Sequence, residues 1–379
     1  MGSEKCNTYL VTGGAGFIGS AFVLSTCARR EAIVVNLDRL TYAANPMNLA
    51  SVEGDSHYIF VHGDIADRQK VRSLFCEYKP CAVVNFAAES HVDRSIDGPG
   101  DFISTNLVGT FHLLEEARRY WGQLPPDARQ AFRFLHVSTD EVYGSLGPED
   151  HPFTEKTPYS PNSPYSASKA GSDHLVRAYN HTYGLPTLIT NCSNNYGPRQ
   201  FPEKLIPLVT LNALKGKPLP VYGKGENVRD WLHVDDHCNA LHLVLQSGRP
   251  GETYNIGGRC ESTNLEVVRA ICRILDVLWP DSPHVPHESL ISFVKDRLGH
   301  DLRYAVDCSK IENELGWRLQ NSFESGLAST VAWYLENREW VRAVETKAYR
   351  EWVTHHYGQG GAAGEVLLMG AGQCSGQER

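Results

Sequence analysis

The sequence of 379 residues has no apolar run long enough to form a transmembrane helix. Its N-terminus, MGSEKCNTYLVTGG, lacks the apolar region of a signal peptide, and Cys6 stands where the myristoylation pattern has Ser or Thr. We therefore expect a soluble, cytoplasmic protein with no membrane partner.

Positive charge is scarce as well. The chain has 36 Lys and Arg against 44 Asp and Glu, which gives a formal net charge of −8. Sequence-independent binding of nucleic acid needs a positive surface, so we expect no nucleic-acid partner. An anionic ligand would have to be held by local positive charge and by backbone amides.

Patterns typical of metal sites are missing too. None of the ten cysteines form a Cys-x-x-Cys pair, which favours ordinary buried thiols. His233 and His237 lie four residues apart in HVDDH, but nothing nearby resembles a zinc site. We expect no bound metal.

The first part of the chain alternates β-branched runs with helical stretches. Strands are expected at 8–12, 32–38, 58–64, 82–88 and 132–139, and helices at 17–30, 67–78 and 102–120. Apolar strands separated by helices indicate a parallel sheet that is covered on both faces. The pattern predicts a doubly wound α/β (Rossmann) fold, with ligands beyond the carboxyl ends of the strands.

After about residue 194 the composition shifts towards Pro, Gly and aromatic residues, with helical patterns at 236–247, 263–278, 309–315 and 323–337. We expect a smaller, mixed α/β domain that closes over the ligand. The first domain would comprise 1–193 and about 230–257. The second would comprise about 194–229 and 258–357, followed by a flexible Gly-rich tail at 358–379.

A glycine motif, VTGGAGFIGS, directly follows the first expected strand. Gly14, Gly16 and Gly19 match G-x-G-x-x-G, and Gly13, Gly16 and Gly19 give the wider G-x-x-G-x-x-G spacing. Such glycines allow a tight turn and let the backbone approach a pyrophosphate at a helix N-terminus. The motif alone could be a structural turn, but a strand before it and an apolar helix after it predict a dinucleotide site.

The second expected strand ends at Asp38, and an acid there binds the adenosine ribose hydroxyls and repels a 2′-phosphate. This favours NAD over NADP. Arg39 follows directly and could serve a phosphate, so the preference stays open at this point. Asp64 and Ile65, after the third strand, are expected near the adenine.

Tyr165 and Lys169 lie four residues apart at the start of an expected helix, which places them on one face. A neighbouring ammonium lowers the pKa of a tyrosine, so the pair can form a base. The alternative is an ordinary helix surface. Because the Tyr-Lys pair follows the predicted dinucleotide-binding strands in the sequence, these features together resemble the extended short-chain dehydrogenase/reductase superfamily. The resemblance implies that Tyr165 removes a hydroxyl proton, Lys169 holds the nicotinamide ribose, and Thr139 hydrogen-bonds the reacting hydroxyl.

Two adjacent acids, Asp140 and Glu141, follow Thr139 at the end of the fifth expected strand. They could be a helix cap and a first-turn acid. They could also carry out an elimination, which needs a base and an acid with separated pKa values. A sugar oxidised at C4 has an acidic C5 hydrogen. Glu141 would remove that hydrogen, Asp140 would protonate the departing C6 hydroxyl, and the hydride would return to C6.

Over roughly residues 6–355 the chain resembles the dTDP-glucose 4,6-dehydratase family. The matching stretches include VTGGAGFIGS, FAAESHVDRSI, VSTDEVYGS, PYSASKAGSDHLV, NCSNNYGPRQFPEKLIPL, GKPLPVYGKGENVRDWLHVDDH and DRLGHDLRYA. Related epimerases and decarboxylases share the glycines and the Tyr-Lys pair but lack the Asp-Glu pair. The resemblance implies tightly bound NAD, a dTDP-glucose substrate, a role in deoxysugar biosynthesis and a homodimer formed through 102–120 and 165–183.

The resemblance also implies two sets of binding residues. Those for NAD are Gly13, Gly16, Phe17, Ile18, Gly19, Asp38, Arg39, Leu40, Thr41, Asp64, Ile65, Phe86, Ala87, Ala88, Ser90, Thr105, Tyr165, Lys169 and Asn195. Those for the sugar nucleotide are Ser90, Thr139, Asn194, Lys204, Leu205, Pro220, Tyr222, Arg229, Asn264, Arg297 and His300. The forked guanidinium groups of Arg229 and Arg297 suit a diphosphate. Leu298 replaces the proline that the family has in this loop, which removes a φ restraint.

Two other functions are considered. A sugar-nucleotide epimerase would oxidise and reduce without elimination, and the pair Asp140-Glu141 argues against it. A non-catalytic NAD-binding sensor would not need Tyr165 and Lys169, which are both present.

Overall fold

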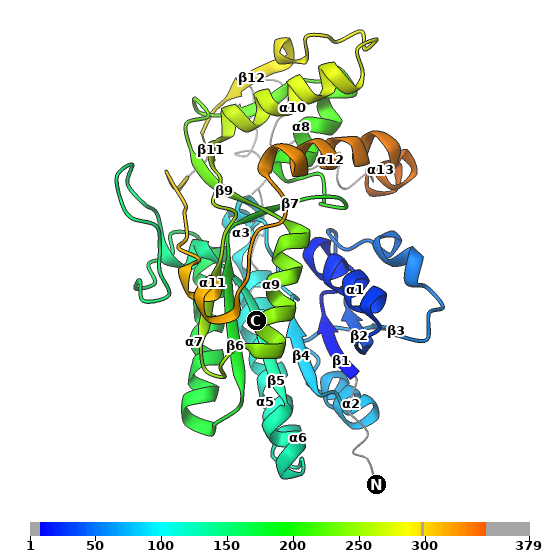
Figure 1. Ribbon diagram of the computed structural model, residues 1–379, viewed down its shortest axis with the longest axis vertical. Helices are drawn as coiled ribbons and strands as arrows, with labels where there is room; N and C mark the ends of the chain where they lie inside the picture. The colour runs from blue at the N-terminus through cyan, green and yellow to red at the C-terminus, as the bar shows by residue number, and fades with distance from the viewer. Residues whose placement is uncertain (1–7, 297–298, 346–379) are drawn as a thin grey trace, which may run out of the picture.

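The computed structural model describes residues 8–296 and 299–345. Its main sheet has seven parallel strands in the order β3-β2-β1-β4-β5-β6-β10 (Figure 1). The strands are β1 (Thr8–Thr12), β2 (Ile33–Asp38), β3 (Tyr58–His62), β4 (Ala82–Asn85), β5 (Arg133–Thr139), β6 (Thr187–Cys192) and β10 (Thr253–Ile256). The predicted doubly wound parallel sheet is confirmed.

Helices cover both faces of this sheet, and each face has its own hydrophobic core. On one face pack α1 (Phe17–Arg29), α9 (Val234–Ser247) and α11 (Ser309–Leu315). On the other pack α2 (Arg68–Tyr78), α5 (Thr110–Trp121) and α7 (Pro164–Tyr183). Because both faces are covered, the central strands are buried throughout, as their apolar sequences require.

The helix expected at 102–120 is interrupted. The chain forms α4 (Pro99–Phe102), a π-helical stretch η2 (Ile103–Gly109) and then α5. Asn106 lies in this π-helical stretch and holds the loop after β4, accepting a hydrogen bond from Glu89 N and donating to Glu89 O. β4 itself ends at Asn85 rather than at 88, because the chain leaves the sheet there. π-Helical turns are often found at functional sites.

Shorter helices complete this part of the molecule. They are η1 (Pro46–Val52), α3 (Val92–Asp97), α6 (Pro126–Ala131) and η3 (Asp140–Tyr143). In the described ranges, no helix is both long and apolar enough to cross a membrane.

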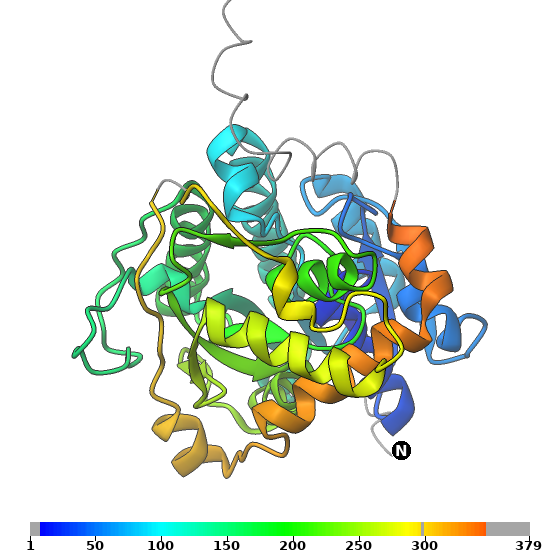
Figure 2. The same cartoon turned by 90° about the horizontal axis from the view of Figure 1, so that it is seen from above.

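A second, smaller region lies above the carboxyl edge of the main sheet in Figure 1 and has a hydrophobic core of its own. Its sheets consist of β7 (Asn194–Tyr196), β9 (Val228–His233) and β11 (Glu261–Thr263), and of β8 (Leu219–Tyr222) and β12 (Ile291–Val294). Its helices are α8 (Leu205–Ala213), α10 (Asn264–Leu278), η4 (His287–Leu290), α12 (Phe323–Glu336) and α13 (Arg338–Val344). Seen from above, α10 and α12 cross over the region where the strands end (Figure 2).

Candidate active site

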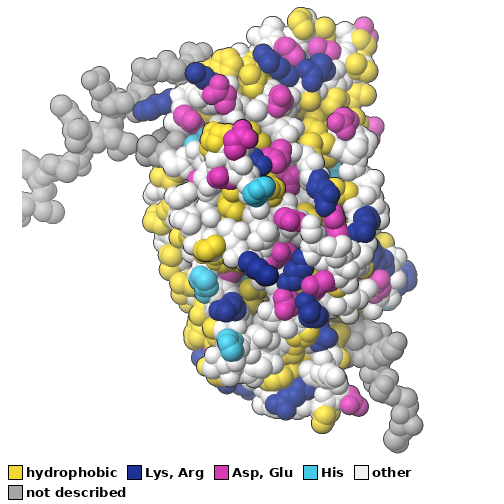
Figure 3. Space-filling model, turned by 60° about the vertical axis from the view of Figure 1, so that its left-hand side comes forward, with side chains coloured by type: hydrophobic (Ala, Val, Ile, Leu, Met, Phe, Trp, Pro, Cys, Tyr) yellow, Lys and Arg dark blue, Asp and Glu magenta, His cyan; other side chains and the backbone are white. Residues whose placement is uncertain are grey.

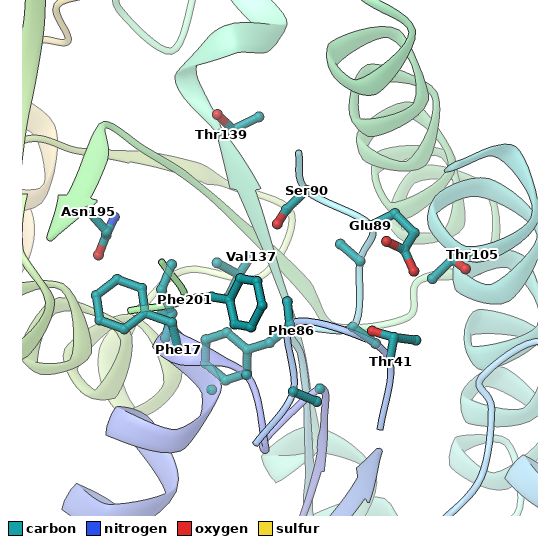
Figure 4. Close-up of a pocket in the computed structure, with 18 of the residues that line it drawn as sticks. Phe17, Thr41, Phe86, Glu89, Ser90, Thr105, Val137, Thr139, Asn195 and Phe201 are labelled. Atoms are coloured by element: carbon teal, nitrogen blue, oxygen red, sulfur yellow. The ribbon is translucent and has the colours of Figure 1, made fainter. Parts of the chain in front are cut away.

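A cavity of about 290 Å³ lies at the carboxyl ends of the parallel strands, and we call it the central pocket. Phe17 and Phe201 lie on one side of it, and Thr41, Glu89 and Thr105 on the other (Figure 4). This is the position in which doubly wound folds bind their ligands.

Most of the predicted site residues line the central pocket. These are Gly13, Gly16, Phe17, Ile18, Gly19, Asp38, Arg39, Thr41, Asp64, Ile65, Phe86, Ala87, Ala88, Ser90, Thr105, Thr139, Asp140, Glu141, Tyr165, Lys169, Asn194, Asn195 and Lys204. Leu40, Leu205, Pro220, Tyr222, Arg229, Asn264 and His300 lie outside this lining. Arg297 and Leu298 lie outside the described residues.

The glycine motif forms a cradle that side chains would fill. Gly13 has a φ of +71°, and a Cβ there would stand 2.7 Å from Ala87 N. A Cβ on Gly19 would stand 2.3 Å from Gly13 O. α1 then begins at Phe17, and in the described chain no side chain caps it. The first N–H groups of the helix are therefore available to a pyrophosphate, so these residues fit a dinucleotide.

Asp38 is held rigidly at the end of β2. Its Oδ2 accepts from Ala15 N and its Oδ1 from Leu40 N, both at 2.8 Å. Burial raises the pKa of this carboxyl, and the two backbone donors oppose the shift. Arg39 donates to Asp64 Oδ2 at 3.0 Å. Because an acid already neutralises Arg39, the arrangement favours NAD over NADP.

Replacing Asp38 with asparagine should weaken NAD binding about tenfold, since a hydrogen bond to a charged group contributes about 1.5–3 kcal/mol. Asparagine keeps only one of the two oxygens that accept from Ala15 N and Leu40 N, so the variant also loses one hydrogen bond of the loop. Calorimetric titration of NAD would measure the change, with Asp55→Asn as a control on an exposed loop away from the pocket. Unchanged affinity in Asp38→Asn would contradict the assigned ribose contact.

Tyr165 and Lys169 project from the first turns of α7, whose start is fixed by a reciprocal hydrogen-bond pair between Ser163 and Ser166. Both site residues are buried, with 8% and 3% of their surface exposed. Lys169 Nζ donates to Val137 O at 2.9 Å. Tyr165 and Lys169 lie on one face of α7, as predicted.

The pKa of Tyr165 differs from the prediction. Burial raises it well above its usual value, and the neighbouring Glu141 adds to the rise, whereas an interaction with the Thr139 hydroxyl lowers it. Lys169 directs its ammonium to the Val137 carbonyl, and it is not among the main influences on the pKa of Tyr165. The positive charge of an oxidised nicotinamide would act in the direction that favours the phenolate.

The acids after Thr139 are arranged differently from a simple helix cap. The cap of η3 is Thr139, whose Oγ1 accepts from Glu141 N at 3.3 Å, so neither acid is needed for capping. Thr139 Oγ1 also donates to Asp140 Oδ1 at 3.3 Å. Asp140 is 2% exposed, and its Oδ2 has no hydrogen-bond partner in the described part of the chain.

Burial raises the pKa of Asp140 well above its usual range, and the carboxyl of Glu141 raises it further. Asp140 is therefore suited to hold a proton at neutral pH. Glu141 is less buried and lines the same pocket. One carboxyl that carries a proton beside another that can accept one is the arrangement that an elimination of water requires.

Of the predicted sugar-nucleotide residues that the structure describes, an inner group lines the central pocket and the others lie outside its lining. The inner group is Ser90, Thr139, Asn194 and Lys204, and the others are Leu205, Pro220, Tyr222, Arg229, Asn264 and His300. Arg229 is buried, donates to Asp301 O at 3.1 Å and packs over the Tyr304 ring. Tyr222 and His300 lie edge to face, with ring centroids 5.9 Å apart. Lys204 belongs to the inner group, where its Nζ donates to Ser90 O at 2.9 Å.

A cluster beside the central pocket was not predicted, in which the buried carboxylate of Glu203 joins the half-buried side chains of Tyr42 and Arg94. Glu203 accepts from Tyr42 Oη at 3.0 Å and from Arg94 Nε at 3.2 Å, and the Arg94 guanidinium stacks on the Tyr42 ring. These contacts tie together the loop after β2, the helix α3 and the loop before α8. In the sequence, Glu203 could be noticed only because it is adjacent to the predicted binding residue Lys204. Its partners Tyr42 and Arg94 are more than 100 residues away, so these contacts could not be predicted.

Comparisons with known proteins agree with this geometry. The family model described as GDP-mannose 4,6 dehydratase matches residues 10–330. A dTDP-glucose 4,6-dehydratase of Xanthomonas campestris pv. campestris (strain B100) is 63% identical over 343 residues, which cover 90% of this chain and 97% of the relative.

Two solved structures are also similar. A dTDP-glucose 4,6-dehydratase of Streptomyces venezuelae, with NAD and TYD bound, superposes with a TM-score of 0.80 at 50% identity, covering 89% of this chain and 100% of that one. A UDP-glucose 4-epimerase of Thermus thermophilus, in complex with NAD, gives a TM-score of 0.76 at 30% identity and covers 87% and 99%.

Proposed function

This chain belongs to the dTDP-glucose 4,6-dehydratase family, and we propose that it converts dTDP-glucose to dTDP-4-keto-6-deoxyglucose with tightly bound NAD. The observation that carries the proposal is the pair Asp140-Glu141, in the same pocket as Tyr165 and Lys169. A dehydrogenase or epimerase needs Tyr165 and Lys169 but has no use for Asp140 and Glu141. The reaction belongs to deoxysugar biosynthesis.

When bound, NAD would supply the acceptor for the hydride from C4 of the sugar and its donor to C6. Tyr165 Oη takes the proton of the C4 hydroxyl, which the Thr139 hydroxyl orients, and Lys169 Nζ would hold the nicotinamide ribose. The C4 ketone makes the C5 hydrogen acidic, and Glu141 removes it. Asp140 then donates its proton to the C6 hydroxyl, which leaves as water. When the hydride returns to C6, Glu141 gives its proton back to C5.

The proton balance gives Thr139 a further task. In each turnover Tyr165 gains the proton of the C4 hydroxyl, and Asp140 loses one to the departing water. Glu141 returns its proton to C5, so the cycle closes when Tyr165 has lost one proton and Asp140 has regained one. The Thr139 hydroxyl interacts with both, donating to Asp140 Oδ1 at 3.3 Å and lowering the pKa of Tyr165.

The division into domains follows the same proposal. The NAD-binding domain comprises 1–193 and about 230–257, whose α9 packs on α1 and whose β10 pairs with β6. We assign the remaining segments, about 194–229 and 258–357, to the sugar-nucleotide domain, although α11 packs on the main sheet. Residues 297–298 and 346–357, and the tail at 358–379, lie outside the described residues. On the face drawn in Figure 3, acidic and basic side chains are intermixed, in line with a small-molecule substrate. We place the enzyme in the cytoplasm, where nucleotide sugars are made.

A homodimer is part of the proposal. Large apolar side chains are exposed on neighbouring helical segments, namely Ile103, Val108 and Phe111 on η2 and α5, and Tyr183 on α7. An exposed apolar surface of this kind suits a second copy of the chain. Light scattering should give twice the chain mass of 42.2 kDa, and a monomer would exclude the dimer.

The function is tested by incubating the purified protein with dTDP-, UDP- and CDP-glucose in parallel. Proton NMR of the product distinguishes the alternatives, because dehydration creates a C6 methyl group and epimerisation inverts C4. We expect a C6 methyl group, formed fastest from dTDP-glucose. If no glucose nucleotide yields a 4-keto product, the chain is not this enzyme.

A further inference from the structure

A histidine lies inside the buried central strand β5. His136 is fully buried, and its imidazole faces α7 behind the central pocket. A polar ring in such a place is costly unless its nitrogens are satisfied. The mechanism above does not use it, although it is in direct contact with Lys169.

The hydrogen bonds around His136 determine which nitrogen carries the proton. Thr12 Oγ1 accepts from Ala87 N and so directs its own hydrogen to Asn85 Oδ1, at 2.6 Å. The amide nitrogen of Asn85 is thereby placed 3.0 Å from His136 Nδ1, which has to act as the acceptor. This arrangement assigns the ring proton to Nε2. Burial and the Lys169 ammonium lower the pKa of His136 to about 4, so the ring is neutral.

His136 Nε2 lies between two groups of opposite charge. It is 3.4 Å from Lys169 Nζ and 3.4 Å from Asp173 Oδ1. Asp173 is 1% exposed and follows Lys169 by one helical turn. Its Oδ2 accepts from Ser138 Oγ and Tyr159 Oη, at 2.8 and 3.1 Å, and its Oδ1 has no hydrogen-bond partner in the described chain.

Lys169 needs an anion close by. Burial lowers the pKa of its ammonium, and Asp173 is the strongest influence in the opposite direction. The titratable groups that face Lys169 are His136 from β5, Cys192 from β6, and Tyr165 and Asp173 from α7 itself. His136 is neutral, and burial raises the pKa of the Cys192 thiol to about 12, so Asp173 supplies the negative charge.

We propose that Asp173 and His136 are positioning residues for Lys169: the buried carboxylate is its counter-charge, and the neutral imidazole fixes the distance between them. The proposal rests on the function proposed above, because it assumes that Lys169 acts in the oxidation of the sugar. Tyr165, Lys169 and Asp173 then form one row along α7, from the pocket to the interior.

The test isolates the oxidation step with the 6-deoxy analogue of dTDP-glucose, which has no C6 hydroxyl to eliminate. Enzyme-bound NADH is followed by absorbance across the pH range. In the wild type, the alkaline limb reports loss of the Lys169 proton. In Asp173→Asn this limb should move to lower pH by about one unit, as expected when an opposite charge is removed nearby.

Tyr159→Phe is the matched control. It removes a hydrogen bond to the same carboxylate but leaves the charge, so its alkaline limb should stay in place. If Asp173→Asn lowers the rate equally at every pH, Asp173 is merely structural and the proposal fails. If Asp173→Asn does not fold, His136→Phe takes its place. It removes the imidazole that lies between Lys169 and Asp173 and should shift the limb in the same direction, and an unshifted limb would again overturn the proposal.

The two proposals fail in different ways. A wild-type protein that forms no NADH from the 6-deoxy analogue, and no product from dTDP-glucose, would overturn the proposed function. A wild-type protein that does both, with Asp173→Asn showing an unshifted alkaline limb, would overturn only the role of Asp173 and His136.

Discussion

Replacing Glu141 with glutamine should stop the reaction after the first chemical step. The amide cannot accept the C5 proton, so product formation should fall by about 10²–10⁴-fold, the usual contribution of a general base. Oxidation at C4 depends on Tyr165, Thr139 and Lys169, which remain. Mixing the variant with dTDP-glucose in a stopped-flow instrument should therefore show enzyme-bound NADH that persists.

Glu53→Gln is a suitable control, because Glu53 is exposed and lies outside the central pocket. It should behave as the wild type in both steps. Rapid product formation by Glu141→Gln would show that another group is the base. Loss of the NADH signal together with product would show that Glu141 has a role already in substrate binding or oxidation.

Asp140→Asn should have its main effect on the departure of the hydroxyl group. Asp140 keeps its proton because it is buried beside Glu141, and an amide cannot donate a proton to the leaving oxygen. Elimination should slow by about 10²-fold or more, with a smaller effect on oxidation. The pKa of Asp140 is raised, so wild-type elimination should persist at neutral pH and decline as the pH rises through that pKa.

A substrate with a better leaving group distinguishes the role of Asp140 from that of Glu141. Fluoride leaves without prior protonation, so the 6-fluoro analogue of dTDP-glucose should restore elimination in Asp140→Asn. It should not restore elimination in Glu141→Gln, because the C5 proton still needs a base. If Asp140→Asn loses oxidation and elimination equally, and the 6-fluoro analogue does not restore elimination, Asp140 has a structural role.

Much of the fold and of the candidate site could be predicted from local patterns in the sequence. The glycine spacing, Asp38 at a strand end and the i, i+4 pair of Tyr165 and Lys169 each depend on residues close in sequence. The carboxyl ends of parallel strands meet at one edge, so Thr139 could also be expected near them. These features follow from chain geometry and need no knowledge of packing.

Features that depend on distant partners could not be predicted in this way. The salt bridge from Arg39 to Asp64 decides between two interpretations of the cofactor preference, and it joins residues 25 positions apart. The pKa of Tyr165 is set by burial, which a helix spacing does not reveal. The π-helical turn at Asn106 and the contact of His136 with Asp173 arise from packing between elements.

The central claim is that one hydride moves within the sugar, from C4 to C6, with loss of water between the two transfers. Its most direct test uses dTDP-glucose that carries deuterium at C4. We expect a product whose C6 methyl group contains one deuterium and whose C4 is a ketone. A product that keeps deuterium at C4 and its hydroxyl at C6 would contradict the account and identify an epimerase.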